Sequence, residues 1–251
     1  FIQGNRGYKR MEQVKTRAIV TRRADYGESN AMLTLITDKL GVVSACAYGV
    51  QSKKSRIKAG TQPLCCSDFV LSRKKGDVYR VESIEIADGF LPVCEDLQLF
   101  ALSNYLCELA GEHAHEDDGQ VLRLLLNTLY VLAYRHEDAS LAKAVFELKI
   151  MQYAGYMPYL ERCMHCGADS AAAFDFSGGI VCENCRKPDM MLLSRDTYLA
   201  LCYILSADEK KLFSFTVSEK VKHDLQILAE AYLLHKSERR YKSLEYFRKI
   251  M

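Results

Sequence analysis

Residues 14–50 read VKTRAIVTRRADYGESNAMLTLITDKLGVVSACAYGV, which is three β-prone runs joined by short turns. The first run alternates in character: Val14, Ala18 and Val20 share one face, while Lys15 and Arg17 share the other. Such period-two alternation predicts a strand with one buried face. The turns contain Gly, Asp and Asn, which tight turns favour. This stretch therefore predicts the first three strands of a β-domain.

Two further β-prone runs follow, CSDFVLSRKK at 66–75 and VYRVESIEIAD at 78–88. The tetrapeptide KKGD (74–77) between them predicts a hairpin turn, with Gly76 where a positive φ is tolerated. Five short strands in this length of chain are typical of a small closed barrel, and we expect an OB-fold over residues 11–92. Residues 1–10 are expected to be a leader or an expression remnant, with Met11 as the natural start.

From Glu95 onward the apolar period becomes helical. Apolar residues recur every three or four positions near 99–109, 122–132 and 141–151, which predicts three packed helices joined by HEDDG and HED. Two more helices are expected at 194–205 and 216–236, the second with Thr216 and Glu219 in capping-box spacing. The expected fold class is therefore α+β. It comprises the N-terminal five-stranded OB-fold barrel, then an α-helical domain at 93–157 and 192–251, with an inserted four-cysteine zinc ribbon at 158–191.

Four of the ten cysteines form two C-x-x-C pairs, Cys163 with Cys166 and Cys182 with Cys185. Two such pairs, fifteen residues apart, supply the four thiolates of a tetrahedral zinc site. Two disulfides are the alternative, which a reducing compartment disfavours. His165 is expected to be exposed, because the four thiolates fill the coordination sphere. A fully ligated zinc has no open position for water, so we expect one structural ion per chain.

Several kinds of chemistry have no signature in the sequence. It lacks G-x-x-x-x-G-K-[ST], G-x-G-x-x-G and H-E-x-x-H, and no H-x-E precedes the C-x-x-C pairs. The segment EHAHEDD (112–118) could form a weak metal site, but a solvated helix end is the favoured interpretation. The longest apolar stretch, 121–134, is interrupted by Arg123 and Asn127 and is too short for a bilayer span. We expect a binding protein, not an enzyme, in the cytoplasm.

The chain has a net charge of +2, but residues 11–90 hold thirteen Lys or Arg against nine Asp or Glu. Barrels of this type bind single strands with a positive groove and aromatic stacking platforms. Tyr26 and Tyr48 lie near the basic loops and are candidate platforms. The alternative is that these cations are solvated loop residues. The candidate DNA-binding residues are Arg17, Arg22, Arg23, Lys39, Lys53, Lys54, Arg56, Lys58, Arg73, Lys74 and Lys75.

The segment from Lys15 to Arg56 resembles the N-terminal barrel of the RecO family of bacterial recombination mediators. The resemblance is carried by the YGES turn at 26–29, the link from Thr37 to Gly41, and the loop from Gly49 to KKSR at 53–56. A helical domain interrupted by C-x-x-C…C-x-x-C follows, as in many members. The resemblance covers essentially residues 11–251 and is strongest over 14–60.

The resemblance implies a concrete function. RecO proteins bind single- and double-stranded DNA and anneal complementary strands without ATP. With RecR they help RecA replace single-strand-binding protein (SSB) at gaps, in the RecF pathway. The family's helical domain receives the acidic C-terminal tail of SSB. The cations of the acidic helical segment are candidates for that contact: Arg123, Arg135, Lys143 and Lys149.

Two other interpretations remain open at this point. The first is a zinc-ribbon transcription or RNA-binding factor, which would prefer RNA or one duplex sequence. The second is a metal-dependent enzyme, for which a metal-bound water and a general base are lacking in the sequence. A strand-annealing assay on SSB-coated oligonucleotides, without nucleotide, separates all three.

Overall fold

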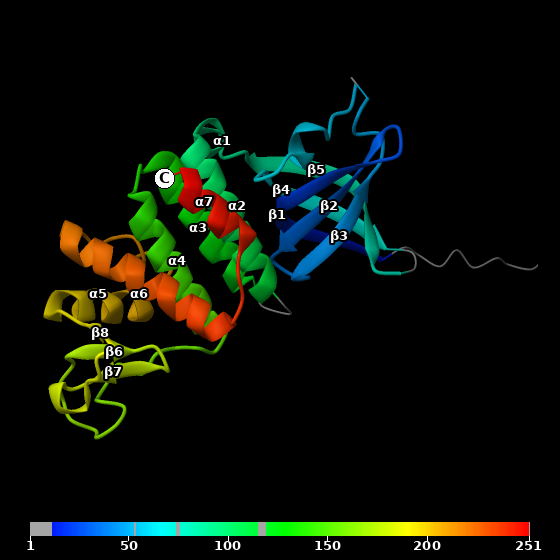
Figure 1. Ribbon diagram of the computed structural model, residues 1–251. Helices are drawn as coiled ribbons and strands as arrows, with labels where there is room; N and C mark the ends of the chain where they lie inside the picture. Colours follow the sequence, from blue (N-terminus) through cyan, green and yellow to red (C-terminus); the bar gives the residue numbers. More distant parts are fainter. Residues whose placement is uncertain (1–11, 53, 74–75, 115–118, 251) are drawn as a thin grey trace, which may run out of the picture. The chain divides into compact units, whose positions relative to one another are not determined.

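The structure is a computed structural model that describes residues 12–52, 54–73, 76–114 and 119–250. Residues 1–10 and the candidates Lys53, Lys74 and Lys75 lie outside the described residues. The chain divides into two compact units, a barrel unit and a helical unit (Figure 1). The barrel unit comprises the described chain up to Gly89 and also Gly119. The helical unit comprises Phe90–Ala114 and the chain from Gln120 onward.

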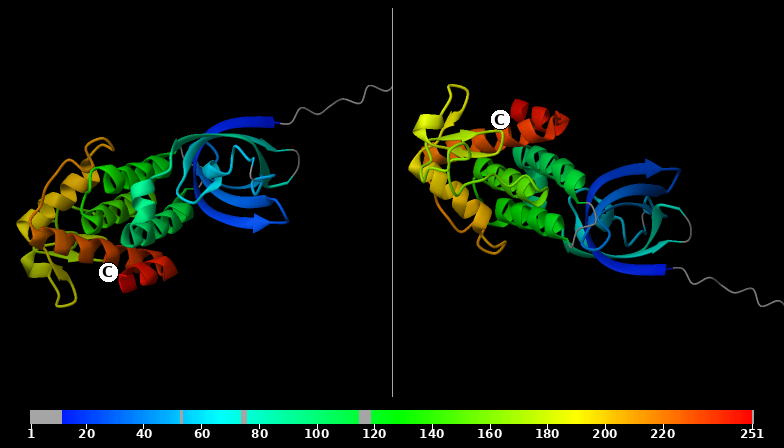
Figure 2. Two further views of the ribbon diagram at one scale, coloured as in Figure 1. Left: turned by 90° about the horizontal axis from the view of Figure 1, so that it is seen from above. Right: turned by 90° about the horizontal axis from the view of Figure 1, so that it is seen from below.

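The barrel unit contains the five predicted strands: β1 (Glu12–Tyr26), β2 (Asn30–Thr37), β3 (Val42–Ala47), β4 (Cys66–Arg73) and β5 (Val78–Asp88). They form a closed barrel in the order β1-β2-β3-β5-β4, and both views of Figure 2 show the strands curving round it. β3 and β5 pair in parallel, and the other pairs are antiparallel. The expected OB-fold is confirmed, and Gly76 between β4 and β5 has a φ of 81°.

Strand β1 is long enough to pair with two neighbours in succession. It pairs with β4 from Glu12 to Ile19 and with β2 from Ala18 to Tyr26, with an irregularity between Val20 and Arg22. The predicted alternation holds over its first half, because Ala18 and Val20 are buried whereas Lys15 and Arg17 are exposed. Beyond Val20, β1 has β2 as its only strand partner among the described residues.

The segment between β3 and β4 folds back onto this second half of β1. It contains the short 3₁₀ helix η1 (Ala59–Thr61), which packs on β5 so closely that a Cβ on Gly60 would lie 2.5 Å from Cγ2 of Ile84. Leu64 N donates to Val20 O (2.8 Å), and Gln51 N donates to Ser29 O (3.1 Å). These contacts fix the two ends of the segment, one beside β1 and the other beside the turn that follows β1.

The helical unit begins with α1 (Leu91–Glu95), α2 (Leu97–His113), α3 (Gln120–Tyr134) and α4 (Ala139–Tyr153). The last three are the helices that the apolar period predicts. Asp138, in the HED joint, caps α4 by accepting hydrogen bonds from Ser140 N and Leu141 N. Every residue from Leu141 to Met151 is buried, so α4 is covered on all sides rather than on one face. Residues 115–118, from the EHAHEDD segment, lie outside the described residues.

Helices α5 (Arg195–Ser206), α6 (Glu219–Ser237) and α7 (Lys242–Ile250) complete the helical unit. The predicted cap of α6 is wrong: Ser218, not Thr216, accepts the hydrogen bond from Val221 N. Both residues can cap, and the sequence does not show which is adjacent to the first helical turn. The sequence also did not predict α7. Its nine residues bury only Leu244 and Phe247, a pattern too short to be distinctive.

The cysteine element forms a small sheet of β6 (Ala173–Asp175), β7 (Gly179–Val181) and β8 (Met191–Leu192), in the order β7-β6-β8, with the 3₁₀ helix η2 (Glu183–Cys185) after β7. The hairpin predicted between the cysteine pairs is β6–β7. The element packs on α6, where the rings of Phe174 and Tyr232 meet edge to face at 5.4 Å. Lys236 Nζ on α6 also donates to Ser177 O (2.6 Å). Among the described residues, no helix has the length and apolar character needed to cross a membrane.

Candidate metal centre and nucleic-acid interface

The four predicted ligands come together in the cysteine element. The Sγ atoms of Cys163, Cys166, Cys182 and Cys185 all lie within 4.8 Å of one another. Tight turns bring them there, because Gly167 N donates to Cys163 O (2.8 Å) and Cys185 N donates to Cys182 O (3.1 Å). Zinc–thiolate bonds of about 2.3 Å in a tetrahedron require sulfur atoms spaced in this way. The cluster therefore fits a tetrahedral metal ion.

The cysteines are free thiols, so the disulfide alternative is not what the structure contains. Cys166 Sγ and Cys182 Sγ lie 3.5 Å apart, far more than the ~2.05 Å of a disulfide bond. His165 is exposed, as expected, and its Nε2 lies 3.2 Å from Asp175 Oδ2. It stands outside the set of four ligands, which is complete without it.

The electrostatics of the cluster favour a bound cation. Burial acts to raise the pKa of Cys163, but hydrogen bonds from the backbone N–H groups of Cys182, Cys166 and His165 lower it to about 6. Hydrogen bonds with Cys166 and Cys182 raise the pKa of Cys185 to about 12. The Cys163 thiolate thus forms easily, whereas Cys185 stays protonated. A divalent ion supplies the positive charge that lets all four become thiolates.

The second candidate site is the cationic surface of the barrel. Of the eight described candidates, seven are exposed, and the side chain of Arg23 is 12% exposed. They do not form one uniform patch, because some make contacts within the barrel and others do not. The exposed ones are Arg17, Arg22, Lys39, Lys54, Arg56, Lys58 and Arg73.

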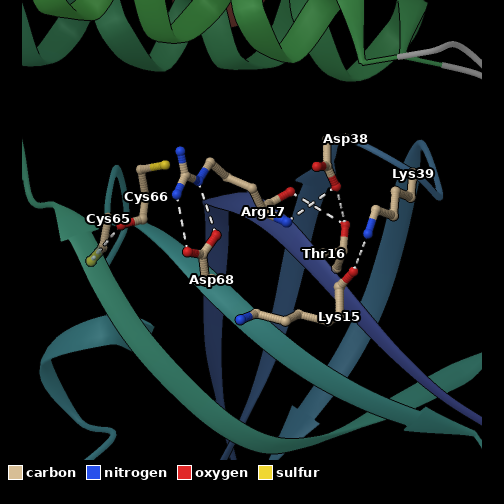
Figure 3. Close-up of polar contacts among 8 residues, drawn as sticks. All are labelled: Lys15, Thr16, Arg17, Asp38, Lys39, Cys65, Cys66 and Asp68. Carbon is tan, nitrogen blue, oxygen red and sulfur yellow. Dashed lines mark hydrogen bonds and ion pairs between the residues drawn. The ribbon is translucent and has the colours of Figure 1, made fainter.

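Arg17 and Lys39 belong to a network that joins β1 to β4 and to the turn after β2 (Figure 3). Arg17 donates to both carboxylate oxygens of Asp68 on β4, at 2.9 and 3.0 Å. Asp38, after β2, accepts from Thr16 Oγ1 (2.5 Å) and from Arg17 N (3.1 Å). Lys39 Nζ donates to Lys15 O (2.6 Å). The charge of Arg17 is therefore offset by Asp68, whereas Lys39 has only a carbonyl as its partner among these contacts.

Three loop cations differ from Arg17 in their surroundings. Lys54, Arg56 and Lys58 are exposed and form no ion pair with any residue that the structure describes. Three cations placed so closely are too crowded to bury their charge, so their natural partner is an anion outside the chain. This is the arrangement that tracking a phosphate backbone requires.

The two candidate platforms are exposed, Tyr26 by 57% and Tyr48 by 51%. The guanidinium of Arg80 lies 5.2 Å from the centre of the Tyr48 ring. Arg80 and Lys15 are further exposed cations of the barrel that are not among the residues predicted from the sequence. Lys15 could have been found from its alternation with Arg17. Arg80 has no such signal in the sequence, because it stands alone between Tyr79 and Val81. The parallel pairing of β3 with β5 brings it close to Tyr48.

The helical candidates separate into surface and interior residues. Arg123 is exposed and pairs with Glu209 (3.1 Å), and Arg135 is exposed. Lys143 and Lys149 are buried, so the prediction that they line a surface for a peptide is wrong. Lys143 Nζ contacts Glu147 Oε1 (2.8 Å) and Glu230 Oε2 (2.6 Å). Lys149 Nζ donates to Gln152 Oε1 (3.0 Å) and Leu205 O (3.1 Å).

These two sites define the class of protein: an OB-fold barrel with an exposed cationic surface, joined in one chain to a helical unit with a four-cysteine cluster. Comparison with known proteins gives the family. The family model described as "Recombination protein O N terminal" matches residues 11–90, and "Recombination protein O C terminal" matches residues 94–245.

Curated relatives agree over almost the whole chain. The DNA repair protein RecO of Acetivibrio thermocellus is 30% identical over 245 residues, covering 95% of this chain and 97% of that protein. RecO of Alkaliphilus metalliredigens is 30% identical, covering 94% and 99%. RecO of Caldicellulosiruptor saccharolyticus is 29% identical, covering 95% and 99%. The chain belongs to the RecO family of DNA repair proteins.

Proposed function

We propose that this RecO-family chain is a recombination mediator that binds single- and double-stranded DNA and anneals complementary strands without ATP. With RecR it helps RecA replace SSB on single strands, in the RecF pathway. The observation that carries the proposal is the exposed set Lys54, Arg56 and Lys58, which has no ion-pair partner among the described residues. It lies in the loop that follows the exposed Tyr48.

The chemistry of annealing explains why such a surface suffices. Two complementary strands repel each other through their phosphates, and a protein that neutralises phosphates on both lowers that repulsion. Phosphate contacts carry no base information, so strand pairing itself selects the partner. Nothing in this scheme requires a nucleophile or a hydrolysed nucleotide, and the protein acts by binding, in the cytoplasm and on the nucleoid.

The four-cysteine cluster holds one structural zinc in this proposal. The donor set and spacing fit zinc, and the ion would stabilise the contacts of Phe174 and Ser177 with α6. Zinc would lock the cysteine element onto the helical unit. The chain's own residues make no open coordination position, because four thiolates complete the tetrahedron.

The partner of the helical unit is the acidic tail of SSB. Of the predicted cations, Arg135 is exposed, and Arg123 is exposed but paired with Glu209. A tail that carries carboxylates and ends in an apolar side chain binds through charge and a small buried anchor. Arg135 is the better candidate for contacting the carboxylates of the tail, and Arg123 is the second candidate.

Strand annealing on SSB-coated complementary oligonucleotides, without nucleotide, tests the function. The proposal expects annealing faster than the spontaneous rate and insensitive to added ATP. A zinc-ribbon RNA-binding or transcription factor would instead bind RNA or one duplex sequence and leave the annealing rate unchanged. That result, with the protein folded and metal-loaded, would contradict the proposal.

A further inference from the structure

One residue of the four-cysteine cluster is exposed to solvent. All ten cysteines lie within the described residues, and the two exposed ones are Cys94 and Cys166. Within the cluster, Cys163 and Cys182 are 2% and 3% exposed, and Cys185 is half-buried. A small oxidant dissolved in water therefore reaches Cys166 more easily than it reaches the other three ligands.

A second cysteine lies directly beside Cys166. The Sγ atoms of Cys166 and Cys182 are 3.5 Å apart, although the two residues belong to different C-x-x-C turns. A disulfide bond is about 2.05 Å long, so the two sulfur atoms need to approach by only about 1.5 Å. Cysteines that respond to peroxide are accessible and often have a neighbouring cysteine that reacts with the oxidised form. Cys166 and Cys182 have both features.

The zinc ion proposed above would hold these sulfur atoms in their reactive form. Zinc binds cysteine as the thiolate. The thiolate is also the form of cysteine that attacks an oxidant. An exposed zinc ligand is therefore both a structural residue and a nucleophile. The inference rests on the proposed zinc centre and adds a reaction to it.

We propose that Cys166 is a peroxide-sensitive thiolate whose oxidation forms a disulfide with Cys182 and releases the zinc ion. The Cys166 sulfur attacks one oxygen of hydrogen peroxide, the O–O bond breaks, and the departing hydroxide takes a proton from solvent to become water. The Cys182 thiolate then attacks the sulfur of the Cys166 sulfenic acid. The S–O bond breaks, and the second hydroxide also leaves as water after protonation. The two thiolates lose two electrons in total, and one peroxide gains them.

The reaction removes two of the four zinc ligands. Cys163 and Cys185 cannot complete a tetrahedral site by themselves, so the ion leaves. The new bond joins the chain before β6 to the chain after β7 and keeps the β6–β7 hairpin closed. Cys163 and Cys185 lose their common ligand. The cysteine element then loosens from α6, where Phe174 meets Tyr232 at 5.4 Å (Figure 1).

The geometry also selects one pairing of the cysteines. Four cysteines allow three disulfide connectivities. The 3.5 Å contact assigns Cys166 to Cys182, which leaves Cys163 and Cys185 as the pair for any further oxidation. Disulfides within the two C-x-x-C turns are the competing outcome.

Peroxide treatment of the purified, zinc-loaded, full-length protein tests the proposal. A chromogenic chelator should report the release of zinc, and a thiol reductant with added zinc should restore the bound ion. Proteolysis after Phe174 and after Glu183 separates Cys166, Cys182 and Cys185 into three peptides. Mass spectrometry should find the first two of these peptides linked. Fragment spectra should place the link on Cys166 rather than on Cys163.

The variant Cys166→His separates reactivity from zinc binding, because three thiolates and one imidazole also hold zinc. Once its zinc content is confirmed, peroxide should release zinc several-fold more slowly than from the wild-type protein. Cys185→His makes the same change of ligand but keeps the reactive pair, so it should still form the disulfide between Cys166 and Cys182. Cys94→Ser removes the exposed thiol outside the cluster and should respond like the wild-type protein.

A first disulfide with any other pairing overturns the inference, as does zinc that stays bound in peroxide while Cys166 is unmodified. Equal release rates for the wild-type protein and zinc-loaded Cys166→His overturn it as well. If Cys166→His holds no zinc, the disulfide map of the wild-type protein decides alone. Carefully purified wild-type protein without zinc would instead contradict the metal centre on which the inference rests.

Discussion

Arg17 on β1 and Asp68 on β4 form a two-point contact, Nε to Oδ1 at 2.9 Å and Nη2 to Oδ2 at 3.0 Å (Figure 3). The pair joins two strands that lie far apart in the sequence and closes the barrel. The hydrogen bond from Arg17 lowers the pKa of the Asp68 carboxyl below its usual value. The first prediction concerns this pair.

Asp68→Asn should destabilise the barrel by less than about 1 kcal/mol, because the pair is partly exposed and solvent screens it. A carboxyl with a depressed pKa in the folded state adds stability above its unfolded pKa and loses it as pH falls through the folded value. The difference between wild type and variant should therefore be fully present at neutral pH and shrink as pH falls below about 4 toward the depressed pKa of Asp68. Urea unfolding across this pH range measures it. A difference that grows on acidification would contradict the assignment.

The cationic loop gives the second prediction. Changing Lys54, Arg56 and Lys58 together to Ala should flatten the slope of log K against log[salt] for a single strand by about 2 units, since each phosphate contact contributes about 0.7. Annealing should slow in parallel, and base preference should not change, because phosphate contacts carry no base information. Titrations across a salt series measure the slope.

A matched triple of exposed lysines in the helical unit, Lys210, Lys211 and Lys220, serves as the control for net charge. Its change to Ala should leave the slope near the wild-type value. If both triples flatten the slope equally, the cationic loop has no special role, and a slope unaltered by the loop variant would mean that its lysines and arginine are merely solvated.

The metal centre gives the third prediction. Cys182→Ser should abolish stoichiometric zinc binding and release the cysteine element from α6, because structural zinc in small modules contributes on the order of 10–16 kcal/mol of apparent binding free energy. Hydrogen exchange should rise in β6, β7 and α6, where Phe174 meets Tyr232, and stay unchanged in the barrel strands. Metal analysis and exchange mass spectrometry are the measurements.

Cys202→Ser is the control, since Cys202 is a half-buried thiol outside the cluster. It should retain one zinc per chain. Iron in place of zinc in carefully purified wild-type protein, or full zinc retention in Cys182→Ser, would contradict the proposed centre.

The buried Lys143 gives the fourth prediction. Lys143→Met removes the cation that faces Glu147 and Glu230 and leaves Glu147 buried without a counter-charge. Breaking a buried pair in this way costs about 3–5 kcal/mol of unfolding free energy. Burial already raises the pKa of Glu147, and loss of Lys143 raises it further. The carboxyl then protonates as pH falls, so the loss should shrink on acidification.

Chemical denaturation at neutral and at mildly acidic pH measures this change. The double variant Lys143→Met with Glu147→Gln is the control and should recover part of the lost stability, because the uncompensated charge is gone. If Lys143→Met were as stable as wild type but bound an SSB tail peptide weakly, Lys143 would be a surface contact and its placement in the core would be wrong.

The fifth prediction concerns the SSB tail. Arg135→Glu should weaken a fluorescent tail peptide several-fold through loss of an exposed charge contact and should leave single-strand affinity unchanged. Lys210→Glu, an equal charge reversal at another exposed position of the helical unit, should weaken the peptide less. Equal effects of the two reversals would show only a general charge effect. A peptide that binds the Arg135→Glu variant normally would show that Arg135 does not contact the SSB tail.

Much of this protein follows from local sequence pattern. The period-two run from Val14 to Val20 and its four successors specify the strands, because side chains on a strand alternate whatever the strand's partners are. The leucine spacing in α2 and α3 specifies helices in the same way. The four cysteines were identified from spacing alone, because two tight C-x-x-C turns place thiols in pairs and a metal ion needs two pairs.

Contacts between distant segments were decided only by the tertiary structure. Asp68 lies opposite Arg17 because the barrel closes in one register, and neither residue's neighbours in the sequence specify that pairing. The sequence predicts Lys143 and Lys149 to be surface cations, since a lysine in a helix is usually exposed. Other helices cover α4 on every side, which local periodicity does not report. The second half of β1 likewise lies beside a loop, because β1 extends beyond its last residue paired with β4, Ile19. The sequence of β1 does not show where that pairing ends. Side-chain periodicity is a property of one segment's backbone, whereas burial, ion pairing and cavities depend on which segments meet, and that is determined by packing of the whole unit.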